Sequence, residues 1–205
     1  MRAANKNILY AIAFLMGFSL MSYEILGVRV LSPYYGSSIY VWGAIISVFL
    51  AGLALGYEQG GRIADKTADL NVLRRIIISP ALLITTFPVY GQRLCKSIYT
   101  LELDSRVSVL LLSMILFFIP CFFMGAVIPI LVKIRAVDSQ KIGSAAGDVY
   151  AMSTAGSIAG TLFTSFFLIS WLSIPKCFLL LGMVLIICWL LCVLFQLKSS
   201  SSLPD

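Results

Sequence analysis

Histidine is absent from the chain, and charged residues make up only 12% of it. The absence of imidazole excludes any histidine-based catalytic triad and any histidine-ligated metal site. The five cysteines are an odd number without paired motifs, which argues against a disulfide framework and against zinc. One bridge, between Cys95 and Cys177, stays open because both residues are expected near the outer membrane surface. No metal and no other cofactor is predicted.

The chain is rich in apolar residues and poor in charged ones. Hydrophobic residues make up 60% of the 205 residues, and the mean hydropathy is +0.99. A soluble domain carries about 25% charged residues, so this composition is typical of a polytopic membrane protein. One helical crossing takes about 20 residues, which leaves room for about six spans and little for a soluble domain. We therefore predict an all-α integral membrane helical bundle that crosses the lipid bilayer about six times.

Six apolar runs are separated by polar turns. The predicted spans cover residues 8–31, 38–57, 76–91, 107–132, 143–169 and 177–196, with polar loops at 58–75, 92–106 and 133–142. Prolines in the third and fourth spans are tolerated in membrane helices, usually with a kink. The first run is longer than the core of a signal peptide, so we expect an uncleaved anchor. The bundle then occupies residues 1–196, and residues 197–205 form a short cytoplasmic tail.

The basic residues indicate the topology. Six spans place both termini on one side of the membrane. If that side is the inside, ten basic residues lie there: Arg2, Lys6, Arg62, Lys66, Arg74, Arg75, Lys133, Arg135, Lys141 and Lys198. The outside then has four, which are Arg93, Lys96, Arg106 and Lys176. Cytoplasmic loops carry an excess of Lys and Arg, so both termini are predicted in the cytoplasm. The net charge of +6 thus indicates topology and not nucleic-acid binding.

Three charged residues lie inside or beside predicted spans and are candidates for a substrate or ion pathway. A charge in hydrocarbon is costly and normally faces protein or water. Glu24, in the first span, either holds a proton or cation or fixes helix packing through a hydrogen bond. Arg29 lies about 140° away around the same helix, so it either pairs with an acid of another helix or extends to the interface. Asp148 either faces the same cavity as Glu24 or caps the start of the fifth span.

Small residues recur every four positions in the second and fifth spans. Such faces let helix backbones approach closely, which is how helices pack where lipid gives no hydrophobic driving force. We therefore assign helix packing to the glycines of these two spans. They are Gly52, Gly56, Gly60, Gly143, Gly147, Gly156 and Gly160.

A charged elbow follows the second span. Its residues Gly61, Arg62 and Asp65, followed by Lys66, fit the pattern G-x-x-x-D-R/K. This resembles the start of the loop signature of major facilitator transporters, although the basic pair of that signature arrives later here. The resemblance implies a cytoplasmic gate in which Asp65 pairs with Arg62 or with an arginine of the following loop. The alternative is an ordinary solvated loop.

A second resemblance is distributed along most of the chain. It is carried by residues 23–29, 36–56, 60–65, 122–133 and 143–163, which include GSSIYVWGAIISVFLAGLALG, FFMGAVIPILVK and GSAAGDVYAMSTAGSIAGTLF. These stretches resemble the membrane domain of the bacterial membrane-bound spermidine synthase-like proteins, often described as fused facilitator/spermidine synthase proteins. The resemblance implies a multi-pass protein of the bacterial inner membrane.

The chain also departs from that family. No aminopropyltransferase domain and no glycine-rich nucleotide loop after a strand is present in the sequence, so we do not expect an enzyme. Ser153 replaces an asparagine common in the family, and Glu58 and Gln59 replace an apolar pair. Intramembrane catalysis lacks a nucleophile–base pair or a metal set.

Two functions remain. The first is a transport or permeation module for a small solute, cationic or polyamine-like, which is favoured by the acids in the spans and by the elbow. The second is a non-catalytic scaffold that docks a separately encoded spermidine synthase-like enzyme or another membrane protein. Six spans could form two three-helix repeats of opposite topology, as in one half of a facilitator. Such a half would need a second one, so we expect a homo-oligomer or a partner subunit.

Overall fold

The computed structural model describes residues 6–136 and 142–200, and these residues form helices and no strand. Six helical segments are long and apolar enough to cross a membrane. The first three are α1 (Lys6–Tyr35), α2 (Ile39–Lys66) and α3 (Leu70–Tyr99). The fourth comprises α4 (Ser105–Ser113), the π-helical turn η1 (Met114–Phe118) and α5 (Ile119–Arg135). The fifth comprises α6 (Ile142–Phe163), the π-helical turn η3 (Thr164–Leu168) and α7 (Ile169–Trp171), and the sixth is α8 (Ile174–Ser200).

The predicted all-α bundle with six spans is confirmed, but its helices are longer than predicted. The loop predicted at 58–75 is wrong, because α2 continues to Lys66 and α3 already begins at Leu70. The side chain of Asp69 accepts a hydrogen bond of 2.8 Å from the Val72 N–H and so caps α3. Likewise α3 extends to Tyr99, which shortens the loop predicted at 92–106. Polar sequence thus marked where the chain leaves hydrocarbon rather than where its helices end.

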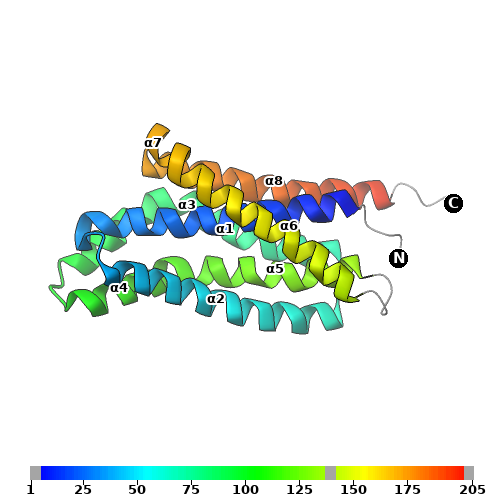
Figure 1. The fold of residues 1–205 in the computed structure, drawn as a ribbon, viewed down its shortest axis with the longest axis horizontal. Coiled ribbons are helices and arrows are strands. Elements are labelled where there is room, and N and C mark those ends of the chain that lie inside the picture. Colours follow the sequence, from blue (N-terminus) through cyan, green and yellow to red (C-terminus); the bar gives the residue numbers. More distant parts are fainter. Residues whose placement is uncertain (1–5, 137–141, 201–205) are drawn as a thin grey trace.

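Consecutive spans run in opposite directions along the bundle, and α1 begins at the same end at which α8 ends (Figure 1). We call this the Lys6 end, and we call the opposite end, where α1 finishes, the Tyr35 end. Of the basic residues used for the topology prediction, Arg2 and Lys141 lie outside the described residues, as do residues 201–205 of the tail. The side chain of Lys198 is not described either.

The pairing of the helices has an internal symmetry. The most extensive contacts join α1 to α6, α2 to α5 and α3 to α8, followed by α1 to α8 and α3 to α5. If the first span is exchanged with the fourth, the second with the fifth and the third with the sixth, the same set of pairs results. Because spans alternate in direction, the two three-helix units run oppositely. This is the pairing that two repeats of inverted topology would have.

Glycines bring the backbones of two equivalent helix pairs into contact. A Cβ atom added at these glycines would meet the backbone of the partner helix. Between α1 and α6 the contacts are Gly156 with Phe14, Gly160 with Phe18 and Gly17 with Ser153. Between α5 and α2 they are Gly56 with Phe122, Gly60 with Ala126 and Gly125 with Leu53. In each pair, two glycines of one helix meet the partner backbone at equivalent places, and one glycine of the partner helix meets the first helix. Gly52 of α2 adds a third contact to its pair, with the backbone of Phe118 and Phe122.

The matching contacts reveal a short repeat in the sequence. Residues 14–17 read Phe-Leu-Met-Gly and residues 122–125 read Phe-Phe-Met-Gly, and both stretches occupy the same place in their pairs. No repeat was evident in the sequence, because four residues are too few to stand out without the contacts. Gly143 and Gly147 behave differently from the other glycines. A Cβ atom at either would meet nothing within 4 Å, so the packing predicted for them finds no partner helix within the described chain.

A proline in the fourth span is compensated by a tyrosine of the first. In an α-helix the carbonyl of Leu116 would accept the N–H of residue 120, but Pro120 has none. The hydroxyl of Tyr23 donates to this carbonyl at 2.9 Å, and Tyr23 itself is 0% exposed. Its ring packs edge-on against Phe117 and Phe178 in the centre of the bundle. The π-helical turn η1 lies at this irregularity.

The turn η3 in the fifth span is stabilised in a similar way. Thr164 donates a hydrogen bond of 2.8 Å to the hydroxyl of Ser22 on α1. The thiol of Cys177 donates to the carbonyl of Leu168 at 3.7 Å. All five cysteines are free and buried, so no bridge joins Cys95 to Cys177.

We expect Gly156→Ala to destabilise the bundle, because the new methyl group would overlap the backbone of Phe14. The cost should be about 1–3 kcal/mol, as for other overpacked sites. Gly147→Ala on the same helix is the matched control, because open space surrounds it. Equilibrium unfolding in detergent micelles measures both variants. Equal stability of the two would contradict the assigned contact.

We expect Tyr23→Phe to leave the Leu116 carbonyl without its partner while keeping the ring packing. Hydrogen bonds between membrane helices contribute about 0.6 kcal/mol on average and up to about 1.7, and a fully buried acceptor at a proline should lie near the upper value. Tyr99→Phe, an exposed tyrosine at the end of α3, serves as the control. The same unfolding measurement tests this, and a Tyr23→Phe variant as stable as wild type would refute the compensation.

Candidate functional site

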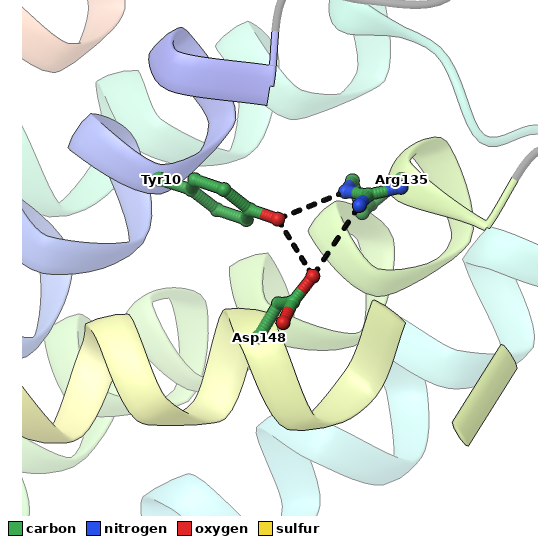
Figure 2. A network of polar contacts seen from close by, with 3 residues as sticks. All are labelled: Tyr10, Arg135 and Asp148. Atoms are coloured by element: carbon green, nitrogen blue, oxygen red, sulfur yellow. Dashed lines mark hydrogen bonds and ion pairs between the residues drawn. The ribbon is translucent and has the colours of Figure 1, made fainter. Parts of the chain in front are cut away.

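A polar cluster joins three helices at the Lys6 end. It consists of Tyr10 near the start of α1, Arg135 at the last position of α5 and Asp148 near the start of α6, and Figure 2 shows the three side chains pointing toward one another. The hydroxyl of Tyr10 donates to Oδ2 of Asp148 at 2.7 Å. Arg135 donates from Nε to the Tyr10 hydroxyl at 3.1 Å and from Nη2 to the same Asp148 oxygen at 3.3 Å. The cluster therefore ties the first three-helix unit to the second.

The helix end favours the position of Arg135, because a guanidinium is stabilised near a helix C-terminus and Arg135 is the last residue of α5. Asp148 lies in the second turn of α6, beyond the first turn in which a carboxylate gains from the helix N-terminus, so it does not cap the helix. The guanidinium also lies 5.8 Å from the centre of the Tyr10 ring. The side chains of Arg135 and Asp148 remain 21% and 45% exposed, so water screens the ion pair in part.

The charged elbow contributes a second tie at the same end. Lys133 of α5 donates to Oδ1 of Asp65 on α2 at 3.1 Å. The prediction that Asp65 pairs with Arg62 or with an arginine of the next loop is wrong, because Arg62 pairs at 2.6 Å with Glu58 one turn earlier on its own helix. The spacing explains this, since residues four apart face each other on a helix. Gly61 has open space around it and brings no helix close.

Glu24 lies far from this cluster. Tyr10 and Glu24 are about 21 Å apart along α1, because an α-helix rises about 1.5 Å per residue. Asp148 therefore does not share a cavity with Glu24, contrary to one of the two expectations for it. Glu24 is half-buried, and within residues 6–136 and 142–200 no hydrogen bond or ion pair is found for its carboxylate.

The surroundings of Glu24 come from both three-helix units. Leu20, one turn before Glu24, lines a recess of about 20 Å³ together with Leu53 and Tyr57 of α2 and Ser153 of α6. Side chains four apart lie on one helix face, so Glu24 continues the face that meets this recess. A space of this size holds about one water molecule. Glu24 therefore lies one turn beyond this recess, on the face of α1 that meets the helices joined by the glycine contacts.

Arg29 occupies a third place, at the Tyr35 end. It is exposed and lines two cavities, one of about 240 Å³ between α1, α3 and α8 and one of about 220 Å³ between α1, α2 and the fifth span. The structure therefore separates the three residues predicted for one pathway. Sequence reasoning missed Tyr10 and Lys133, whose partners come from distant helices. A tyrosine and a lysine near span ends gave no signal of their own.

No protein-family model matches the chain, and comparisons with curated proteins and with solved structures show no significant similarity. Any function for this bundle therefore has to be argued from the residues described above.

We expect Asp148→Asn to destabilise the protein by about 1 kcal/mol at low salt, because it removes the acceptor charge that Tyr10 and Arg135 share. The loss should shrink at high salt, which screens a half-exposed ion pair. Glu58→Gln, which disrupts a pair within one helix, is the control and should cost less than about 0.5 kcal/mol. Unfolding in detergent at two salt concentrations measures both. Equal effects of the two variants would refute the cross-helix role.

Proposed function

We propose that this membrane protein is a transport or permeation module for a small cationic solute, with Glu24 as the group that binds the solute or a coupling cation. One observation carries the proposal. A half-buried carboxylate lies about two-thirds of the way along the first membrane span, and no hydrogen bond or ion pair with a described residue compensates it. An ionisable group at that depth marks a substrate or ion path by default, because it costs several kcal/mol without a compensating role.

The arrangement around Glu24 supports the same function. Transporters built from inverted repeats bind their substrates near the middle of the membrane, where the repeats meet. Glu24 lies on the α1 face beside a recess formed by helices of both units. A carboxylate accepts hydrogen bonds and attracts cations, so ammonium groups are the matching chemistry. A polyamine, as the resemblance to spermidine synthase-like proteins implies, has such groups.

The ion pairs at the Lys6 end fit a gate on the cytoplasmic side of this path. Two contacts, Tyr10–Asp148–Arg135 and Asp65–Lys133, cross between the two three-helix units there. Seven basic residues with described side chains gather toward this end: Lys6, Arg62, Lys66, Arg74, Arg75, Lys133 and Arg135. We therefore propose that the Lys6 end faces the cytoplasm of a bacterial inner membrane. A second copy or a partner subunit would complete the path.

The second candidate function is a scaffold that docks another protein, such as a separately encoded spermidine synthase-like enzyme or a membrane subunit. One feature favours it. Gly143 and Gly147 lie exposed on α6 with open space around them, although glycines at this spacing normally serve close helix packing. A partner helix in the membrane would cover them.

We expect wild-type protein in proteoliposomes to take up labelled spermidine, and Glu24→Gln to reduce uptake at least about tenfold, because a charge-assisted hydrogen bond contributes about 1.5–3 kcal/mol. Glu102→Gln, in the turn after α3, is the control for lost negative charge. Equal uptake by Glu24→Gln and wild type would remove Glu24 from the path. No uptake by wild type, together with a stoichiometric copurifying protein in mass spectrometry, would favour the scaffold instead.

A further inference from the structure

The cavity at the Tyr35 end between α1, α3 and α8 has an apolar interior. Its lining includes Phe87, Pro88 and Phe178, with Pro33 and Arg29 from α1. The rings of Phe87 and Phe178 stack with 4.0 Å between their centres, so they form a fixed wall. The volume of about 240 Å³ is below the range of about 300–1,000 Å³ typical of small-molecule pockets. A segment of hydrocarbon chain fits this space better than a polar solute does.

A second cavity adjoins the same arginine and is lined differently. Arg29 is shared by both cavities, and the second, of about 220 Å³, is also lined by Ser32, Ser37, Ser165 and Trp42. Ser32 donates its hydroxyl hydrogen to the Val28 carbonyl at 2.7 Å and lies 3.4 Å from the Ser37 hydroxyl. The Arg29 guanidinium, the Ser165 hydroxyl and the Trp42 ring N–H remain as groups that can donate hydrogen bonds to an oxyanion. No acid lines either cavity. An apolar space and an oxyanion-binding space thus meet at one cation.

The depth of Arg29 suits a lipid headgroup. It lies less than two turns from the end of α1, which places it about 9 Å from Tyr35 along the axis. Trp42 and Tyr34, which line the two cavities, are residue types that gather at membrane interfaces. Within the described residues no hydrogen bond or ion pair is found for Arg29. Its guanidinium is therefore available to an oxyanion from the membrane.

We propose that these two cavities form a binding site for an anionic phospholipid, whose phosphate Arg29 binds and whose acyl chain enters the apolar cavity. Two further basic residues follow lining residues directly in the sequence, Arg93 after Gln92 and Lys176 after Pro175. Both are exposed and belong to the same end of the bundle, but neither lines one of the two cavities. The assignment is independent of the proposed transport function, because it rests on Arg29 and is tested by lipid binding and not by uptake.

The experiment uses the full-length protein in a neutral detergent, with three probes: dioleoyl phosphatidylglycerol, dioleoyl phosphatidylcholine and glycerol 3-phosphate. We expect phosphatidylglycerol to raise the unfolding temperature in a concentration-dependent way, and native mass spectrometry to retain one lipid per chain. In Arg29→Gln the affinity should fall about fivefold, since each basic residue contributes about that factor to binding of anionic lipid. Arg29→Lys should recover part of the loss.

Lys96→Gln is the matched control, because Lys96 is an exposed cation at the same end that lines neither cavity. It should bind phosphatidylglycerol as wild type does. Unchanged affinity in Arg29→Gln would overturn the site. If phosphatidylcholine raised the unfolding temperature as much as phosphatidylglycerol does, recognition of the negative charge would be overturned. An equal response to glycerol 3-phosphate would show that free phosphate esters are bound and would overturn the role of the acyl chain.

Discussion

Helices in lipid gain no hydrophobic free energy from packing together, so this bundle depends on close backbone contact at its glycines. Gly156 and Gly160 on α6 lie against the backbone of α1, and Gly56 and Gly60 on α2 lie against the backbone of α5. These two pairs are equivalent under exchange of the three-helix units. The contacts fix how the units face each other and thereby place the junction beside which Glu24 lies.

The second constraint is that polar groups in hydrocarbon need partners within the protein. The described chain meets this constraint at Pro120, where Tyr23 donates to the carbonyl that the proline leaves free. It meets it again at η3 through Thr164 and Ser22. Glu24 and Arg29 are the contrast, because each stays without such a partner among the described residues. The transport proposal starts from Glu24 and the lipid-binding proposal from Arg29. The two residues differ in the sign of their charge and in their position along α1.

The two proposals concern two positions of α1 that differ in charge and in distance from the Tyr35 end. Glu24 lies one turn from Leu20, which lines the recess shared with α2 and α6. Arg29 lies about 8 Å farther along α1, toward the Tyr35 end, between the cavity beside α3 and α8 and the cavity beside α2 and the fifth span. The ion pairs at the Lys6 end join the units on the other side of Glu24.

The sequence alone determined the number of spans, because hydrocarbon thickness sets the length of an apolar run, and it determined the charge asymmetry of the two ends. It also marked Glu24 and Arg29, since a charge in an apolar run is visible without a fold. Only the tertiary structure decided that Asp65 meets Lys133, that Asp148 meets Tyr10, and that Gly156 packs while Gly147 does not. These outcomes depend on which helices become neighbours. Helix pairing is set by contacts between residues far apart in the chain, and a local pattern of small or charged residues does not specify its partner.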